Sequence, residues 1–309
     1  MKNLAPILLF VYNRPVHTKS TLTALRENHL SKDSLLYIYS DGPKSTASEQ
    51  ELDAIKEVRE IIRSEQWCGE VYIQEGPENL GLAQSIIGGV TEVIEKHGKA
   101  IILEDDILTN RYFIQFMNDA LEIYHDNEIV SGISGYSYCE NDNLPEPYLL
   151  PIGSSWGWGT WKRQWSTTEW DAEKLYGQIK HLARSMDFGN IPFEEMLNKQ
   201  KNGEIDSWAI RFYASMFLND QYFFYPRKAL IKNIGFDDQG THTKGSNSFY
   251  ERNVEDATAP VKIAELETPD NEIVKFVDQH CRKSLSQPEA LTQKLKKKAL
   301  AFINRAISK

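Results

Sequence analysis

Five short apolar runs alternate with segments of helix length over the first 136 residues. The runs lie at 5–12, 35–40, 70–74, 100–104 and 129–134, and the intervening segments at 17–29, 48–65, 81–97 and 110–125. Parallel strands need crossovers of about this length, and right-handed crossovers join them into one sheet. Within 81–97, the apolar residues Ile86, Val90 and Val93 recur at the spacing of a helix that covers a sheet. The alternation therefore predicts an α/β fold with a Rossmann-like sheet flanked by helices.

The pattern changes after Tyr136. A short motif, Trp156-Gly157-Trp158-Gly159-Thr160-Trp161, stands out in this part of the chain. The other segments predict a loop, a group of helices, one or two strands around Pro226, and a polar Gly-rich loop, at 137–153, 171–220, 221–234 and 235–258 respectively.

The composition indicates a folded chain and argues against nucleic acid as a partner. Of the 309 residues, 41% are hydrophobic and 26% are charged, so a sizeable core can form. The 44 acidic residues outnumber the 35 basic ones, and the net charge of −9 is opposite to that of most duplex-binding proteins. The three cysteines, Cys68, Cys139 and Cys281, are widely spaced and fit neither a disulfide framework nor a zinc site. We expect reduced thiols and a cytoplasmic location.

The two ends of the chain bear on membrane contact. The apolar run at 4–12 contains Pro6 and lacks a small-residue cleavage site, which favours a buried first strand over a signal peptide. No apolar stretch reaches the roughly 18 residues of a spanning helix. From Arg282 to Lys309, eight basic residues and one acidic residue give a local charge of +7 on an amphipathic helix pattern. Through 285–309, such a helix can contact an anionic membrane at the inner face of the plasma membrane, or it can pack on the domain.

Three predicted strands end in residues that can bind ligands. The strand ends are Tyr12-Asn13-Arg14-Pro15, Ser40-Asp41-Gly42-Pro43 and Glu104-Asp105-Asp106. Ligands of open parallel sheets bind beyond these carboxyl ends. Three adjacent carboxylates are destabilising unless a cation or hydrogen-bond donors offset them, and carboxylates plus substrate phosphates commonly hold a divalent ion. The acidic triplet, Glu104 to Asp106, therefore predicts a metal–phosphate site, with a helix N-cap before 110–125 as the alternative.

Missing motifs narrow the reaction class. The sequence contains no Gly-x-x-x-x-Gly-Lys loop and no Gly-x-Gly-x-x-Gly after the first strand. Both absences argue against a P-loop enzyme and against a nicotinamide-dependent dehydrogenase. We expect the phosphates of a nucleotide to be held mainly by a metal.

The order of five motifs resembles that of the GT-A glycosyltransferases. The chain is similar to their bacterial family-2-like group and, through its Glu-Asp-Asp triplet, to the eukaryotic family-13 N-acetylglucosaminyltransferase that initiates complex N-glycans. The motifs lie within residues 5–245, and they are Pro6–Pro15, Ser40–Gly42, Asn79–Ala83, Leu103–Asp106 and Gly157–Trp161. The resemblance implies a GT-A fold, a Rossmann-like mixed sheet with a helical acceptor-side region, to which a C-terminal amphipathic helix is added.

The resemblance also implies donor-side roles. Asp106 would ligate Mn²⁺ or Mg²⁺, and Asp41 would bind the uracil ring. His242 is a second candidate for a metal or phosphate contact, although a single loop histidine is more often solvated. The remaining nucleotide-sugar contacts would be Tyr12, Arg14, Asn79, Gly81, Glu104 and Asp105. Relatives often carry an arginine where this chain has Gln84, which leaves one cation fewer near the diphosphate.

On the acceptor side, inversion at a sugar requires a carboxylate that takes the proton of the acceptor hydroxyl. The expected base is Asp206, which lies where relatives place an acid at a helix start before a tryptophan. The alternative is that Asp206 only caps this helix. The rival bases are Glu169, Asp171, Asp237 and Asp238.

The tryptophan motif contains the expected acceptor contact, Trp158, because sugars stack on aromatic faces. Large aromatic residues also fill cores, and we expect two of Trp156, Trp158 and Trp161 to do so.

These observations predict a metal-dependent inverting glycosyltransferase. The expected donor is a nucleotide sugar, in particular a UDP-sugar, and the expected acceptor is a saccharide, with lipid-linked saccharides of surface polysaccharide (O-antigen or capsule) synthesis as candidates. The alternatives are a sugar nucleotidyltransferase and a carbohydrate-binding protein without catalysis. The expected divisions are a nucleotide-sugar-binding half at 1–136, an acceptor-binding and catalytic half of the same domain at 137–258, and a C-terminal extension at 259–309.

Overall fold

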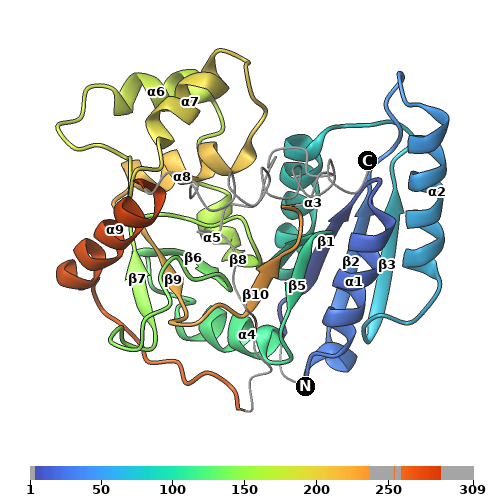
Figure 1. The fold of residues 1–309 in the computed structure, drawn as a ribbon, viewed down its shortest axis with the longest axis horizontal. Coiled ribbons are helices and arrows are strands. Elements are labelled where there is room, and N and C mark those ends of the chain that lie inside the picture. The colour runs from blue at the N-terminus through green and yellow to red at the C-terminus, as the bar shows by residue number, and fades with distance from the viewer. Residues whose placement is uncertain (1–3, 237–253, 255–258, 287–309) are drawn as a thin grey trace, which may run out of the picture.

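A mixed sheet of eight strands forms the centre of the molecule, with helices on both of its faces (Figure 1). The structure is a computed structural model that describes residues 4–236, 254 and 259–286. The strand order is β3-β2-β1-β4-β8-β6-β9-β7. The predicted Rossmann-like α/β class is therefore confirmed.

The first half of the sheet is parallel and follows the predicted alternation closely. Its strands are β1 (Ile7–Val11), β2 (Leu35–Ser40), β3 (Glu70–Glu75) and β4 (Lys99–Glu104), and its crossover helices are α1 (Pro15–Arg26), α2 (Glu49–Arg63) and α3 (Leu82–His97). Pro15 starts α1, and a capping box of Ser48 and Glu51 starts α2. In the order β3-β2-β1-β4 the last crossover returns across the sheet, so α3 lies on the face opposite α1 and α2.

The second half of the sheet contains β6 and β9 at predicted strand positions, and two strands, β7 and β8, that the sequence did not indicate. The elements are α4 (Phe113–Ile123), β6 (Val130–Ser134), β7 (Tyr148–Leu150), β8 (Trp158–Trp161) and β9 (Tyr222–Tyr225). The tryptophan motif forms β8, which pairs antiparallel with β4 on one side and with β6 on the other. The prediction of a continuous loop at 137–153 is wrong at β7, which pairs with β9.

A separate two-stranded sheet follows the acidic triplet. It pairs β5 (Ile107–Thr109) with β10 (Ile231–Asn233) in antiparallel fashion, and a short 3₁₀ turn, η1 (Ser31–Asp33), lies before β2. Helix α4 begins only at Phe113, with Tyr112 as its N-cap. The alternative that the triplet caps this helix is therefore wrong.

Four short helices follow β8 in the chain and precede β9. They are α5 (Lys162–Trp165), α6 (Ala172–Ile179), α7 (Phe193–Lys201) and α8 (Trp208–Leu218), and α6 and α7 lie above α8 in Figure 1. Helix α9 (Asn271–Ser286) lies beside β7 and buries Val277 and Cys281. The predicted amphipathic tail lies beyond Ser286, outside the described residues. Within the described part of the chain, no helix has the length and apolar character needed to cross a membrane.

Candidate active site

Asp41, at the end of β2, organises the loop that follows β3. Its Oδ1 accepts hydrogen bonds from the backbone N–H groups of Gly42 and Leu80, both at 2.9 Å. Its Oδ2 accepts from Asn79 Nδ2 at 3.0 Å and from the Gly81 N–H at 3.1 Å. An ionised carboxylate has about four acceptor positions, and these bonds use them. The motifs at 40–42 and 79–81 therefore form one hydrogen-bonded unit.

Backbone geometry and one arginine let this unit close. A side chain at residue 42 would collide with the backbone of Glu78, since a Cβ there would lie 2.4 Å from the Glu78 nitrogen. Gly81, the N-cap of α3, has a φ of +80°, which favours glycine. Arg59 of α2 donates to the Gly76 carbonyl at 2.7 Å and so holds the loop after β3 next to α2. No sequence pattern indicated Arg59, because its bonds to the Asp41 and Gly76 carbonyls depend on how α2 packs on the sheet.

Arg14 joins the end of β1 to the acidic triplet. Its guanidinium makes a two-point contact with Asp105, through Nη2 to Oδ1 and through Nε to Oδ2 at 3.3 Å. Its Nη1 donates to Asp106 Oδ2 at 3.0 Å. An internal cation thus offsets the adjacent carboxylates, as their spacing in the sequence required.

Burial and repulsion shift the titration of these groups. Burial, followed by the charges of Asp106 and Asp105, raises the pKa of Glu104 to about 8. Burial also raises the pKa of Asp105 to about 6, against the lowering effect of Arg14. For Arg14 itself, burial lowers the pKa, but the two neighbouring carboxylates outweigh it and the net shift is upward. Burial and the two neighbouring carboxylates thus disfavour the charged form of Glu104.

Tyr12 lies on the Asp41 side of the same strand end. Burial raises the pKa of its hydroxyl, the Lys44 backbone lowers it, and the charges of Glu51 and Asp41 add to the rise. The fold therefore brings Tyr12, Arg14, the Asp41 unit and the acidic triplet to one edge of the sheet, as the order of strand ends predicted.

The described residues offer a divalent ion a shared site. No group of three or more His, Cys, Asp or Glu side chains in this part of the chain could hold a metal alone. The Asp106 side chain is 13% exposed, whereas that of Asp105 is 5% exposed and bound to Arg14. A hard cation can be held by one carboxylate when phosphates and water complete its shell. The donor set fits an ion of this kind, and His242 lies outside the described residues.

Gly235 approaches this cluster from β10. A Cβ at residue 235 would lie 2.1 Å from Asp106 Oδ2 and 3.1 Å from Arg14 Nη1. The preceding Ile234 N–H donates to the Asp106 carbonyl at 2.9 Å. No sequence signal pointed to Gly235, because the contact depends on the pairing of β10 with β5.

Asp206 lies across from the Asp41 unit. Its Oδ2 is 3.8 Å from the position of a Cβ at Gly81, and its side chain is 64% exposed. Arg211 Nη2 lies 3.5 Å from Asp206 Oδ1. The N-cap of α8 is Ser207, whose hydroxyl accepts from the Ile210 N–H at 3.3 Å. The alternative that Asp206 caps this helix is therefore wrong, and its carboxylate faces the donor-side loop.

Two rival bases have structural tasks. Asp171 is the N-cap of α6 and accepts from the N–H groups of Glu173 and Lys174. Glu169 accepts from the Asp171 N–H, and this bond lowers the pKa of the exposed Glu169 carboxyl. The other two rivals, Asp237 and Asp238, lie outside the described residues.

The tryptophan prediction needs one correction. Trp158 has no exposed surface, and its ring stacks on Trp208 with centroids 4.7 Å apart. The assignment of Trp158 to the acceptor is therefore wrong, because a sugar cannot reach a side chain that is fully buried. Trp161 is also buried, so two of the three motif tryptophans belong to the core, as expected. Trp156 is partly exposed and lines a pocket instead.

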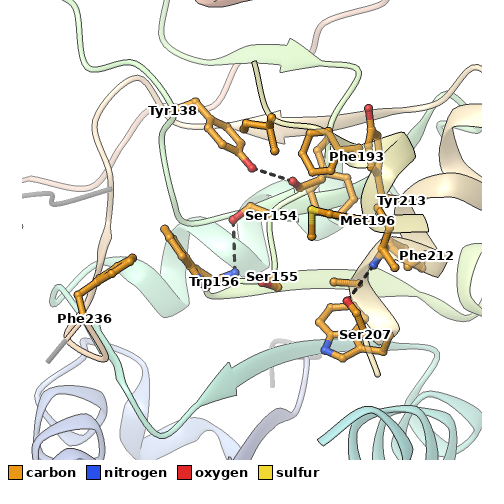
Figure 2. Close-up of a pocket in the computed structure, with 16 residues that line it drawn as sticks. Tyr138, Ser154, Ser155, Trp156, Phe193, Met196, Ser207, Phe212, Tyr213 and Phe236 are labelled. Atoms are coloured by element: carbon orange, nitrogen blue, oxygen red, sulfur yellow. Dashed lines mark hydrogen bonds between the residues drawn. The ribbon is translucent and has the colours of Figure 1, made fainter. Parts of the chain in front are cut away.

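That pocket lies between α7, α8 and the loop before β8 (Figure 2). It has a volume of about 450 Å³, within the range of small-molecule sites. Its wall includes Trp156 and Phe236 on one side and Phe193 and Met196 on the other (Figure 2), and Trp208 also lines it.

Comparisons with known proteins return structural similarities only. No protein-family profile and no curated protein matches the chain. A structure of S. aureus TarS 1-349 has a TM-score of 0.40 and 11% identity over 75% of this chain, which spans 61% of that one. A UDP-glucose pyrophosphorylase complexed with UDP-glucose has a TM-score of 0.36 and 10% identity, with coverage of 72% and 90% of the two chains. Mouse xyloside xylosyltransferase 1, in its apo form, has a TM-score of 0.33 and 9% identity, with coverage of 71% and 83%. Similarities at these TM-scores assign neither a family nor an activity.

Proposed function

We propose that this protein is a glycosyltransferase that uses a nucleotide sugar, with a UDP-sugar as the expected donor and a saccharide as the acceptor. The observation that carries the proposal is that Asp206 lies opposite the carboxyl ends of β1, β2 and β4. The Asp41 unit and the Arg14–Asp105–Asp106 cluster lie at the carboxyl edge of the sheet, and Asp206 faces Gly81 of that unit. A donor bound at this edge would therefore lie between the Arg14–Asp105–Asp106 cluster and the exposed carboxylate of Asp206.

On the donor side, Asp106 would hold a Mn²⁺ or Mg²⁺ ion together with the diphosphate. When bound, such an ion supplies positive charge to the departing diphosphate. Arg14 keeps Asp105 and Asp106 in place and adds its own charge next to the phosphates. The Asp41 unit shapes the nucleotide pocket. Uracil recognition by Asp41 remains a prediction. It requires that an N–H group of the uracil ring replace one of the four N–H donors whose hydrogen bonds Asp41 accepts.

On the acceptor side, Asp206 acts as the general base of an inverting transfer. The acceptor oxygen forms a bond to the anomeric carbon, the bond from that carbon to the diphosphate oxygen breaks, and the acceptor proton passes to Asp206. The exposure of the Asp206 carboxylate leaves it accessible to an acceptor hydroxyl. A lipid-linked acceptor at the inner face of the plasma membrane, reached through the basic tail, belongs to the same proposal.

Two other functions are distinguished from this one by the products that they form. A sugar nucleotidyltransferase would convert a UDP-sugar and pyrophosphate to UTP and a sugar 1-phosphate. The Tyr12–Pro15 segment after β1 lacks the glycines usual for that class. A carbohydrate-binding protein would form no product, and it would leave the arrangement of Asp206 opposite the strand ends without a task.

The deciding experiment incubates the full chain with UDP-glucose, UDP-galactose or UDP-N-acetylglucosamine, with and without Mn²⁺. We expect UDP release that depends on Mn²⁺ and that Asp106→Asn loses. Asp126→Asn, a change at a carboxylate that is 97% exposed, serves as the matched control and should keep full activity. UTP formation from pyrophosphate, or sugar binding without any product, would contradict the proposal.

A further inference from the structure

The apolar pocket opens next to the proposed reaction site. Ser207, in its wall, directly follows Asp206, and Phe236 directly follows Gly235, which contacts Asp106 and Arg14. The two ends of the pocket are therefore each one residue away from groups assigned to the base and to the donor. Figure 2 shows the rings of Trp156 and Phe236 near one end and Ser207 near the other.

Four polar side chains in the wall form hydrogen bonds within the protein. The Tyr138 hydroxyl donates to the Gly153 carbonyl at 3.1 Å, and the Tyr213 hydroxyl donates to the Met186 carbonyl at 2.6 Å. The Ser154 hydroxyl accepts from the Trp156 N–H at 3.3 Å. Ser207 in turn caps α8. A sugar placed here would lose bonds to water without gaining equivalent ones, which is costly for each hydroxyl.

The absence of charged side chains from the described wall favours an apolar ligand. No Asp, Glu, Lys or Arg side chain of the described residues lines the pocket, whereas aromatic and aliphatic side chains make up most of it. A phosphate or a carboxylate would therefore find no counter-charge. Hydrocarbon, by contrast, gains about fourfold in affinity for each methylene that leaves water.

We propose that this pocket binds an aliphatic chain carried by the acceptor, which places the acceptor sugar between Asp206 and the donor. The inference rests on the proposed function for its direction, because the sugar end must point toward Asp206. The substrate class is thus a glycoside with a linear or isoprenoid hydrocarbon aglycone. The volume of about 450 Å³ suits the part of the chain nearest the sugar.

Binding of n-octyl β-D-glucopyranoside below its micellar concentration tests the pocket without a donor. Isothermal titration of the full chain should give at least tenfold tighter binding than that of methyl β-D-glucopyranoside, which lacks the chain. Equal affinities for the two glycosides overturn the proposal.

Substitutions locate the bound chain. Ala209→Phe places a ring in the pocket from the first turn of α8 and should remove the preference for the octyl glycoside. The matched control, Ala54→Phe, makes the same change at a partly exposed position of α2, far from the pocket, and should keep the preference. Gly153→Ala is a second, milder variant. A Cβ there would make only ordinary contacts with Phe223, the nearest at 3.5 Å, so the protein should fold. The added methyl group takes space in the pocket and should weaken octyl binding about threefold. An undiminished preference in folded Ala209→Phe or Gly153→Ala protein overturns the proposal, because the chain then binds elsewhere.

The proposed function is tested separately by UDP release. If the full chain prefers the octyl glycoside but releases no UDP, the glycosyltransferase assignment is contradicted while the pocket still binds a chain. Mn²⁺-dependent UDP release without an octyl preference contradicts only the pocket. If both hold, the octyl glycoside should also accelerate UDP release more than the methyl glycoside does.

Discussion

At the scale of single residues, Asp41 shows how a binding motif can serve the fold. Its carboxylate accepts four hydrogen bonds, and an asparagine amide at the same place has one oxygen and an NH₂ group that faces N–H donors. We expect Asp41→Asn to lower the free energy of unfolding by about 1–3 kcal/mol, the range for buried groups that lose an acceptor. Urea denaturation measures this change, and UDP titration should show weaker binding as the 79–81 loop loosens.

The control for that prediction is Asp53→Asn on the exposed face of α2, which should change the stability by less than about 0.5 kcal/mol. An Asp41→Asn protein as stable as the control would mean that the loop does not depend on this carboxylate.

Asp206 gives the second prediction at this scale. Asp206→Asn keeps the shape of the side chain but cannot accept a proton, so kcat for UDP release should fall by about 10²–10⁴. The melting temperature should not change, because Ser207 and not Asp206 caps α8. Glu204→Gln, two residues earlier and also exposed, is the matched control and should keep kcat. A near-normal kcat for Asp206→Asn would move the role of base to Asp237 or Asp238.

The candidate site could be predicted where it depends on strand ends and not where it depends on long-range packing. Arg14, Asp41 and the acidic triplet follow apolar runs directly, so their common edge followed from the sheet alone. Gly235 and Arg59 enter through backbone contacts between distant segments, which leave no pattern in the sequence. Trp158 was misplaced because the sequence cannot tell a buried tryptophan from one that faces a ligand.

At the scale of elements, the strands with continuous apolar runs and the two strands around Pro226 were predictable, whereas β5, β7 and β8 were not. β5 and β7 have three residues each, too few for an alternation to show. β8 has the sequence Trp-Gly-Thr-Trp, in which the tryptophans are three residues apart, and its place is fixed by packing. A Cβ at Gly159 would lie 3.0 Å from the Ala100 carbonyl oxygen, so the backbone of β8 fits closely against its neighbours.

Docking of α9 gives a prediction for an element as a whole. A Cβ at Gly189 would lie 2.1 Å from the Cβ of Cys281, and the Gly189 N–H donates to Asp278 Oδ1 at 2.7 Å. Gly189→Ala should therefore push α9 away from the domain and expose the Cys281 thiol. Labelling by iodoacetamide at pH 8, followed by mass spectrometry, should show a rate at Cys281 at least tenfold above that of the unmodified protein.

The control variant for α9 is Gly203→Ala. Gly203 has a φ of +73°, close to the +59° of Gly189, but no atom lies within 4 Å of its Cβ position, so it adds the same backbone strain without a collision. Cys68 is an internal reference, because burial raises the pKa of its thiol to about 11 and little of the reactive thiolate exists at pH 8. Equal labelling of Cys281 in the two variants would show that strain alone, and not the contact with α9, releases it.

At the scale of the whole molecule, charge is distributed unevenly along the chain. The 28 residues from Arg282 carry +7, and the rest of the chain carries −16. The proposed site lies in the acidic part, and the proposed acceptor carries a hydrocarbon chain. A basic end that contacts an anionic membrane would therefore bring an acidic domain, which the membrane repels, close to a substrate anchored there.

Deletion of residues 287–309 tests this arrangement, and it preserves α9, which ends at Ser286. The segment carries six basic residues and one acidic residue. At about 1 kcal/mol for each basic residue near an anionic surface, its loss should reduce co-sedimentation with phosphatidylserine vesicles by more than tenfold, and 0.5 M salt should reduce that of the full chain similarly. UDP release in solution should stay the same, because the site residues lie before Gly235. Equal sedimentation of the two proteins would instead favour a tail packed on the domain, and the acceptor would then have to reach the pocket without help from the membrane surface.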